Sequence, residues 1–164
     1  MSYIIDLGQQ LQSTAFGTAL AESTFAFPFI EGVHLIGLSL SVGLLFLIDL
    51  RLIGVFLKNV PVTQLLHQLR PLILTGFGAI FVSGVLLFWS EAATVLHSPA
   101  FPVKFFFIFL GGLNALYFEL VLAKQPAVQE NHAVLPANVR YAGAASLTLW
   151  VLVIIAGRLI PYLP

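Results

Sequence analysis

The chain has 164 residues, of which 59% are hydrophobic and only 9% are charged, and its formal net charge at pH 7 is zero. Soluble domains carry about 25% charged residues. A soluble fold of this size could not bury so much apolar surface, so the composition indicates a membrane protein. The zero net charge provides no basic surface for nucleic acid. The absence of cysteine excludes disulfides, thiolate metal sites and covalently attached haem.

Residues 1–24 are mixed in character and predict an interfacial amphipathic segment. Ile4, Leu7 and Leu11 recur at helical spacing with polar residues between them, which is typical of a helix lying in the membrane interface. A break is expected at 13–17, followed by a second short turn. The segment lacks the basic residues and apolar core that mark a cleaved signal peptide.

Four long apolar stretches predict an all-α polytopic membrane protein, a four-transmembrane-helix bundle formed by residues 25–164. A spanning helix needs roughly 20 residues, and the expected spans are 27–56, 71–90, 102–123 and 137–160. Thr63 is expected to cap the helix before the second span and Pro71 to kink it, and residues 91–100 are expected to form a loop. Small residues on every span allow close helix packing.

The distribution of lysine and arginine predicts the orientation, since cytoplasmic loops carry an excess of these residues. Two of the seven, Lys104 and Arg158, fall on the side of the termini. We therefore expect a bacterial inner-membrane protein with both termini in the periplasm. The other side collects five: Arg51, Lys58, Arg70, Lys124 and Arg140.

His34 is the one histidine expected inside a span, and it is the first candidate for chemistry. Glu31 lies three residues earlier on the same helix face, and Gly37 and Ser41 leave room beside the imidazole. Buried ionisable groups in membranes are costly and tend to be functional. We expect His34 to be an axial haem ligand or a copper ligand, with Glu31 or His97 as second ligand or orienting partner. An equally weighted alternative is a hydrogen bond from His34 to another helix. The remaining histidines are expected at interface depth, where most are only solvated: His67, His97 and His132.

Asp49 and Arg51 form the second polar set of the first span. Residues two apart on a helix do not face each other, so each needs its own partner. Arg70 and Arg140 are candidates for Asp49, and Glu119 is a candidate for Arg51. We expect these five residues to form a structural charge network that clamps the helices. The alternative is an ion or proton path, extended inward by Asn114 and Thr148.

Three segments carry a resemblance to a known group of proteins: FPFIEGVHLIGLSLSVGLLFLIDLRLIG, HSPAFPVKFFFIFLGGLNALYF and SLTLWVLVIIAGRLIPYL. They resemble an uncharacterised family of small bacterial four-span inner-membrane proteins. Its pattern is His-Leu/Ile-x-Gly, Asp-Leu-Arg-Leu-x-Gly, Asn-Pro-Ala-Phe-x-x-Lys and a Gly-Arg near the C-terminus. Ser98 replaces the asparagine and Lys104 is kept. Glu119 stands where members often carry a histidine, which moves any ligand role implied there to Glu119.

A more distant similarity involves His34 before a glycine-rich half-helix and Lys104 leading to Asn114. These features are similar to membrane domains of the copper-resistance D type, which implies metal handling or redox work. The chain has a single methionine and no cysteine. Because soft sulfur ligands are the usual choice for Cu(I), copper transport would need a histidine route.

The sequence contains no nucleophile–base set, phosphate loop or zinc-hydrolase spacing, so we expect a non-enzymatic protein. The leading hypothesis is a small integral membrane redox or metal-binding protein, in its sharpest form a b-type haem electron carrier with His34 as ligand and a periplasmic redox partner. The alternative is a cofactor-free accessory or structural subunit of a larger membrane complex. Copper handling or transport comes third, because no broken helix or duplicated half is visible.

Overall fold

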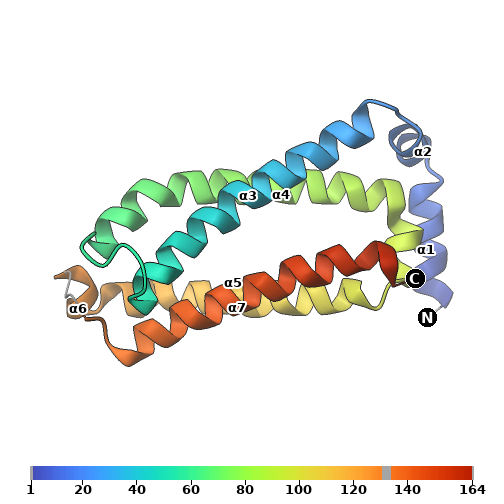
Figure 1. Ribbon diagram of the computed structural model, residues 1–164. Helices are drawn as coiled ribbons and strands as arrows, with labels where there is room; N and C mark the ends of the chain where they lie inside the picture. The colour runs from blue at the N-terminus through green and yellow to red at the C-terminus, as the bar shows by residue number, and fades with distance from the viewer. Residues whose placement is uncertain (1, 131–133, 164) are drawn as a thin grey trace.

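The computed structural model describes residues 2–130 and 134–163, and every regular element in these ranges is helical. His132 lies outside the described residues. Four long helices lie along one axis: α3 (Ala26–Ile53), α4 (Val62–His97), α5 (Ala100–Leu120) and α7 (Ala137–Leu159) (Figure 1). The short elements are α1 (Ser2–Gln12), α2 (Ala15–Ala21), η1 (Leu122–Lys124), α6 (Pro126–Gln129) and η2 (Ile160–Tyr162).

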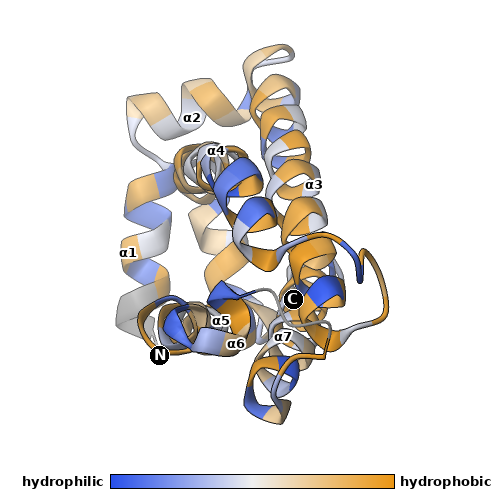
Figure 2. Cartoon of the chain, turned by 90° about the vertical axis from the view of Figure 1, so that its left-hand side faces the viewer, coloured by the Kyte–Doolittle hydropathy of each residue, from blue (hydrophilic) through white to orange (hydrophobic). Residues whose placement is uncertain are grey.

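The four long helices confirm the all-α fold class, and each is long and apolar enough to cross a membrane. Hydrophobic residues colour most of their length (Figure 2), and large hydrophobic side chains are exposed on all four helices. Such surfaces require lipid as their solvent. The chain is thus a multi-pass protein associated with the lipid bilayer. Its two ends lie at the same end of the bundle (Figure 1), as an even number of crossings requires.

The bundle is closed on three sides and open on the fourth. α3 packs along α4 and along α7, and α5 packs along α7. Among the described residues, α4 and α5 share no comparable interface. Stacking of Phe88 on Phe101 joins these two helices near the connection at 98–99. The structure therefore leaves a lateral seam between α4 and α5.

α3 and α4 cross at very close range because glycines replace side chains at the contact. A Cβ on Gly76 would lie 2.9 Å from the Ser41 Cβ and 3.0 Å from the Gly37 carbonyl oxygen. The Ser41 hydroxyl donates to that same carbonyl oxygen at 2.7 Å. Small residues that allow backbones to approach are a common way for helices to associate in lipid.

α3 ends at a left-handed glycine. Gly54 has φ of 86°, and its N–H donates to the carbonyl oxygens of Leu50 and Arg51. Glycine adopts this backbone conformation without steric cost and commonly ends helices. The buried Arg51 side chain then fastens the following loop, because its Nε donates to the Val60 carbonyl oxygen at 2.7 Å.

α4 differs from the expected second span in length and in the position of its kink. The predicted loop at 91–100 is wrong, because the helix continues to His97. The non-helical backbone inside it is at Glu91 (φ −128°, ψ 24°) and not at Pro71. Thr63 lies inside the helix, and Pro61 precedes its first residue. Thirty-six residues extend about 54 Å, so α4 is longer than the roughly 30 Å hydrocarbon core.

The N-terminal helices explain why α4 continues past Glu91. α1 and α2 lie across the end of the bundle and pack on α4 (Figure 1). Gly8 lets α1 approach the backbone of Ala92. The Gln12 Oε1 accepts the Ala93 N–H at 3.0 Å, just beyond the kink, where the regular helical hydrogen bonds are interrupted. Trp89 donates its indole N–H to the Thr14 hydroxyl at 3.1 Å.

We expect Gly76→Ala to destabilise the protein, because the new methyl group would meet backbone and Ser41 at about 3 Å. Overpacking of this kind costs about 1–3 kcal/mol. Gly78→Ala is the matched control on the same helix, since a Cβ there meets nothing within 4 Å and alanine favours helix by about 1 kcal/mol. Thermal unfolding of the detergent-solubilised protein measures both variants. An equal response to the two substitutions would contradict the close crossing.

Candidate functional site

His34 extends from α3 toward α4, where its Nδ1 lies 2.9 Å from the Ser83 Oγ. The Ser83 hydroxyl already donates its one hydrogen to the Ala79 carbonyl oxygen. Because that hydrogen is used, we assign the donor in the His34–Ser83 bond to the Nδ1–H of the imidazole. The neutral ring then carries its free lone pair on Nε2. Nε2 is the nitrogen through which such an oriented histidine can bind a metal or accept a proton.

Residues from α3, α4 and α5 lie around this imidazole. Gly84 of α4 gives it room, since a Cβ there would lie 3.3 Å from the His34 Cε1. Glu31 of α3 and Lys104 of α5 are the charged groups within electrostatic range. The end of the Lys104 side chain lies against α7, at 3.5 Å from a Cβ position on Gly157. We call Glu31, His34, Ser83 and Lys104 the outer cluster.

His97 is not brought to His34. It lies exposed at the end of α4. The helical rise of about 1.5 Å per residue separates position 97 from position 84, which touches His34, by about 20 Å. Glu31 is exposed. In the described ranges no group of three or more His, Cys, Asp or Glu side chains could hold a metal ion. The outer cluster therefore offers one imidazole nitrogen as a ligand.

The charged residues at the opposite end of the bundle do not form the pairs that were expected from their similar depth in the membrane. Arg70 forms a bidentate ion pair with Glu119, its Nη2 lying 2.6 and 2.7 Å from the two carboxylate oxygens. The Arg140 Nε donates to the Ile53 carbonyl oxygen at 3.2 Å, and the Arg51 Nε donates to the Val60 carbonyl oxygen. Each arginine thus has a partner other than Asp49, because the helix rotations aim Arg51 and Arg140 at the end of α3 and its loop.

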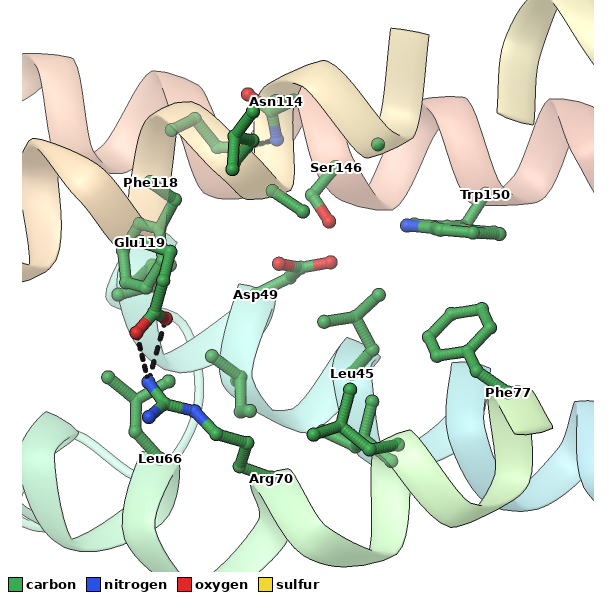
Figure 3. A pocket seen from close by; sticks show the side chains of 18 of the residues that line it. Leu45, Asp49, Leu66, Arg70, Phe77, Asn114, Phe118, Glu119, Ser146 and Trp150 are labelled. Atoms are coloured by element: carbon green, nitrogen blue, oxygen red, sulfur yellow. Dashed lines mark hydrogen bonds and ion pairs between the residues drawn. The ribbon is translucent and has the colours of Figure 1, made fainter. Parts of the chain in front are cut away.

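Asp49 is consequently buried without a counter-ion among the described residues. Its side chain belongs to a residue that is 2% exposed, and its Oδ2 has no hydrogen-bond partner. The Ser146 hydroxyl of α7 points toward the carboxylate (Figure 3). An unpaired carboxylate in an apolar interior is costly, so its position needs a reason.

Asp49 lines an apolar cleft of about 620 Å³ that lies at the seam between α4 and α5. α3 and α7 form its floor, and the Arg70–Glu119 pair lies at its rim (Figure 3). Trp150 also borders the cleft, and its buried indole nitrogen has no hydrogen-bond partner in the described structure. Other lining residues that shape the cleft are Leu45, Phe77, Ile108, Asn114, Phe118 and Ser146.

Sequence reasoning singled out Asp49 but missed the cleft. Ser146 and Trp150 are one turn apart on α7 and face the same way, yet in the sequence they are an ordinary small residue and an ordinary core aromatic. The signal that could have found them is the four-residue spacing of Ser146 and Trp150. It places both side chains on one face of α7, but the sequence had assigned arginine partners to the Asp49 carboxylate that they face. Only the pairing of Arg70 with Glu119 shows that Asp49 is left over.

The Arg70–Glu119 pair is expected to contribute little to stability. Both side chains are about half exposed, at 48% and 47%, and exposed ion pairs are worth about 0.2–1 kcal/mol. A double-mutant cycle with Arg70→Gln and Glu119→Gln, read by thermal unfolding, should give a coupling energy in that range. A coupling well above this range would mean that the pair is shielded from water and acts as a true clamp.

Comparison with known proteins identifies the family to which the chain belongs. A model described as a family of unknown function, DUF6644, matches residues 15–163. No curated protein and no solved structure matches the chain. The match includes all four long helices, in agreement with the resemblance of the sequence to an uncharacterised four-span family. The chain therefore belongs to DUF6644, a family of unknown function.

Proposed function

We propose that this protein is a small, non-enzymatic membrane protein that binds a redox-active metal centre through His34, with b-type haem as the specific form and electron transfer as its role. The observation that supports the proposal is the Nδ1 contact with Ser83. With the Ser83 hydroxyl as acceptor, that contact places the ring proton on Nδ1 and the lone pair on Nε2. A histidine held by its other nitrogen is the usual arrangement of a metal ligand.

The charges near His34 favour haem over a bare copper ion. The Lys104 ammonium lies within electrostatic range of the imidazole. A cation there repels a copper ion, whereas it attracts the carboxylates that haem carries. One histidine is sufficient as a proximal haem ligand, which agrees with the distance to His97. His34 would hold the iron and Lys104 would face the acidic edge of the group, which supplies one-electron chemistry when bound.

We further propose a bacterial inner membrane location with both termini in the periplasm. Five of the seven lysine and arginine residues fall on the side away from the termini, and such an excess is typical of the cytoplasmic side. The outer cluster then lies in the periplasmic half of the membrane, so its redox partner would be periplasmic.

Two exposed glycines favour a second candidate function. In this role the protein would be a cofactor-free accessory subunit of a larger membrane complex. A Cβ on Gly43 or Gly78 would meet nothing within 4 Å, and both glycines are exposed on long helices. Small residues facing lipid are suited to close packing against helices of another subunit.

An absorbance spectrum with metal analysis on the detergent-solubilised protein tests the haem proposal. We expect a Soret band that is lost in His34→Ala and kept in His97→Ala and His67→Ala, since both control histidines are exposed and far from the outer cluster. Ser83→Ala should weaken haem retention, because Nδ1 loses its acceptor. A folded, colourless and metal-free wild type that copurifies with other membrane subunits would instead support the accessory role.

Reporter fusions test the orientation. With the C-terminus in the periplasm, alkaline phosphatase fused after residue 164 should be active, and a green fluorescent protein fused there by the general secretory route should be dark. Fusions placed in the 58–61 connection should behave oppositely. An inactive phosphatase with a bright fluorescent fusion at the C-terminus would reverse the orientation.

A further inference from the structure

The cleft holds two buried polar atoms whose hydrogen-bonding needs are complementary. The Asp49 Oδ2 requires a donor, and the Trp150 Nε1–H requires an acceptor; neither has a partner in the described structure. The nitrogen end of the indole faces the side of the cleft where Asp49 lies (Figure 3). Both residues are more than nine-tenths buried. A hydroxyl group matches both needs, since it donates one hydrogen bond and accepts others.

The remaining walls are mostly apolar, with Asn114, Ser146 and the Arg70–Glu119 pair as the polar exceptions, and the volume is far larger than one hydroxyl group or water needs. The cleft measures about 620 Å³, whereas a water occupies about 30 Å³ in the liquid. Leucine, isoleucine and phenylalanine side chains form most of the lining. The hydroxyl must therefore belong to a molecule with a substantial hydrocarbon body.

The position of the cleft indicates where such a molecule comes from. The cleft lies at the seam where α4 and α5 lack an extensive interface, within the helices that cross the bilayer. A lipid-soluble molecule can enter through this seam from the membrane. Aromatic rings border the cleft: Phe77 and Trp150 both line it, with their ring centroids 5.0 Å apart. Such rings favour an aromatic head group over a flexible aliphatic one.

We propose that the cleft binds a neutral, lipid-soluble phenol, with its hydroxyl between Asp49 and Trp150 and its hydrocarbon body along the α4–α5 seam. Hydroquinones with an apolar tail belong to this chemical class. The binding site is separate from the outer cluster, because no outer-cluster residue lines the cleft. Asp49 is then retained as a recognition group, which explains a buried carboxylate without a counter-ion.

Binding of 4-nonylphenol to the full-length protein in lipid nanodiscs tests the proposal. The chain has two tryptophans, so a Trp89→Phe background makes Trp150 the single fluorescent reporter. We expect a saturable change in Trp150 fluorescence with the phenol. Its methyl ether, 4-nonylanisole, keeps the ring and tail but cannot donate to Asp49, so it should bind about tenfold more weakly or worse.

Asp49→Leu should reduce phenol binding by a similar factor without lowering the unfolding temperature, because it removes a buried carboxylate that has no counter-ion among the described residues. Asp49→Asn, which keeps the shape and one acceptor oxygen, should fold and bind with an intermediate affinity. Thr148→Val is the control on α7, since its hydroxyl donates to the Ala144 carbonyl oxygen of its own helix and Thr148 does not line the cleft. It should bind like the parent.

Three outcomes would overturn the proposal: equal binding of phenol and ether, unchanged binding in Asp49→Leu, or a fluorescence change that never saturates, as expected if the cleft holds only water. Tighter binding of 1-dodecanol than of the phenol would reject an aromatic head group. The result is independent of the haem proposal, because His34→Ala should leave phenol binding unchanged.

Discussion

Two glycine contacts position α3, and the rest of the bundle follows from them. Gly76 of α4 meets α3 near Ser41. Gly143 of α7 meets it near the other end, where a Cβ would lie 2.9 Å from the Leu52 Cβ and 3.1 Å from the Asp49 carbonyl oxygen. In lipid there is no hydrophobic force between apolar helices, so such close backbone contacts provide much of the association. Because α3 is fixed between α4 and α7, α5 packs mainly on α7.

This arrangement explains why the two polar regions differ. In the half of the bundle that carries the chain termini, the close crossing of α3 and α4 brings His34 onto Ser83 and satisfies one ring nitrogen. In the other half, α3 inclines toward α7, so Asp49 faces Ser146 and the cleft rather than an arginine of α4 (Figure 3). One helix therefore carries an oriented histidine near one end and a carboxylate oxygen without a partner near the other. At that second end Val62, Leu122, Val128 and Val139 are fully buried.

Membrane burial gives both regions their chemical significance. In water an unpaired carboxylate or indole nitrogen is solvated at little cost, but in a protein surrounded by hydrocarbon it must find a partner. The exposed Arg70–Glu119 pair is an ordinary ion pair by comparison. For this reason the unsatisfied Asp49 and Trp150 are stronger indications of a ligand than the ion pair at the rim.

The sequence by itself determined the solvent, the four spans and the polar candidates, since apolar length and the cost of buried charge can be read residue by residue. The sequence wrongly predicted a loop after Glu91. The helix α4 continues there because α1 stabilises it through Gln12 and Gly8, and no local sequence pattern reveals these contacts. The sequence could name Asp49 and His34 but not their partners. Only the tertiary structure decided those, because helix rotation and tilt, set by glycines on neighbouring helices, determine which side chains meet and leave the cleft between α4 and α5 open.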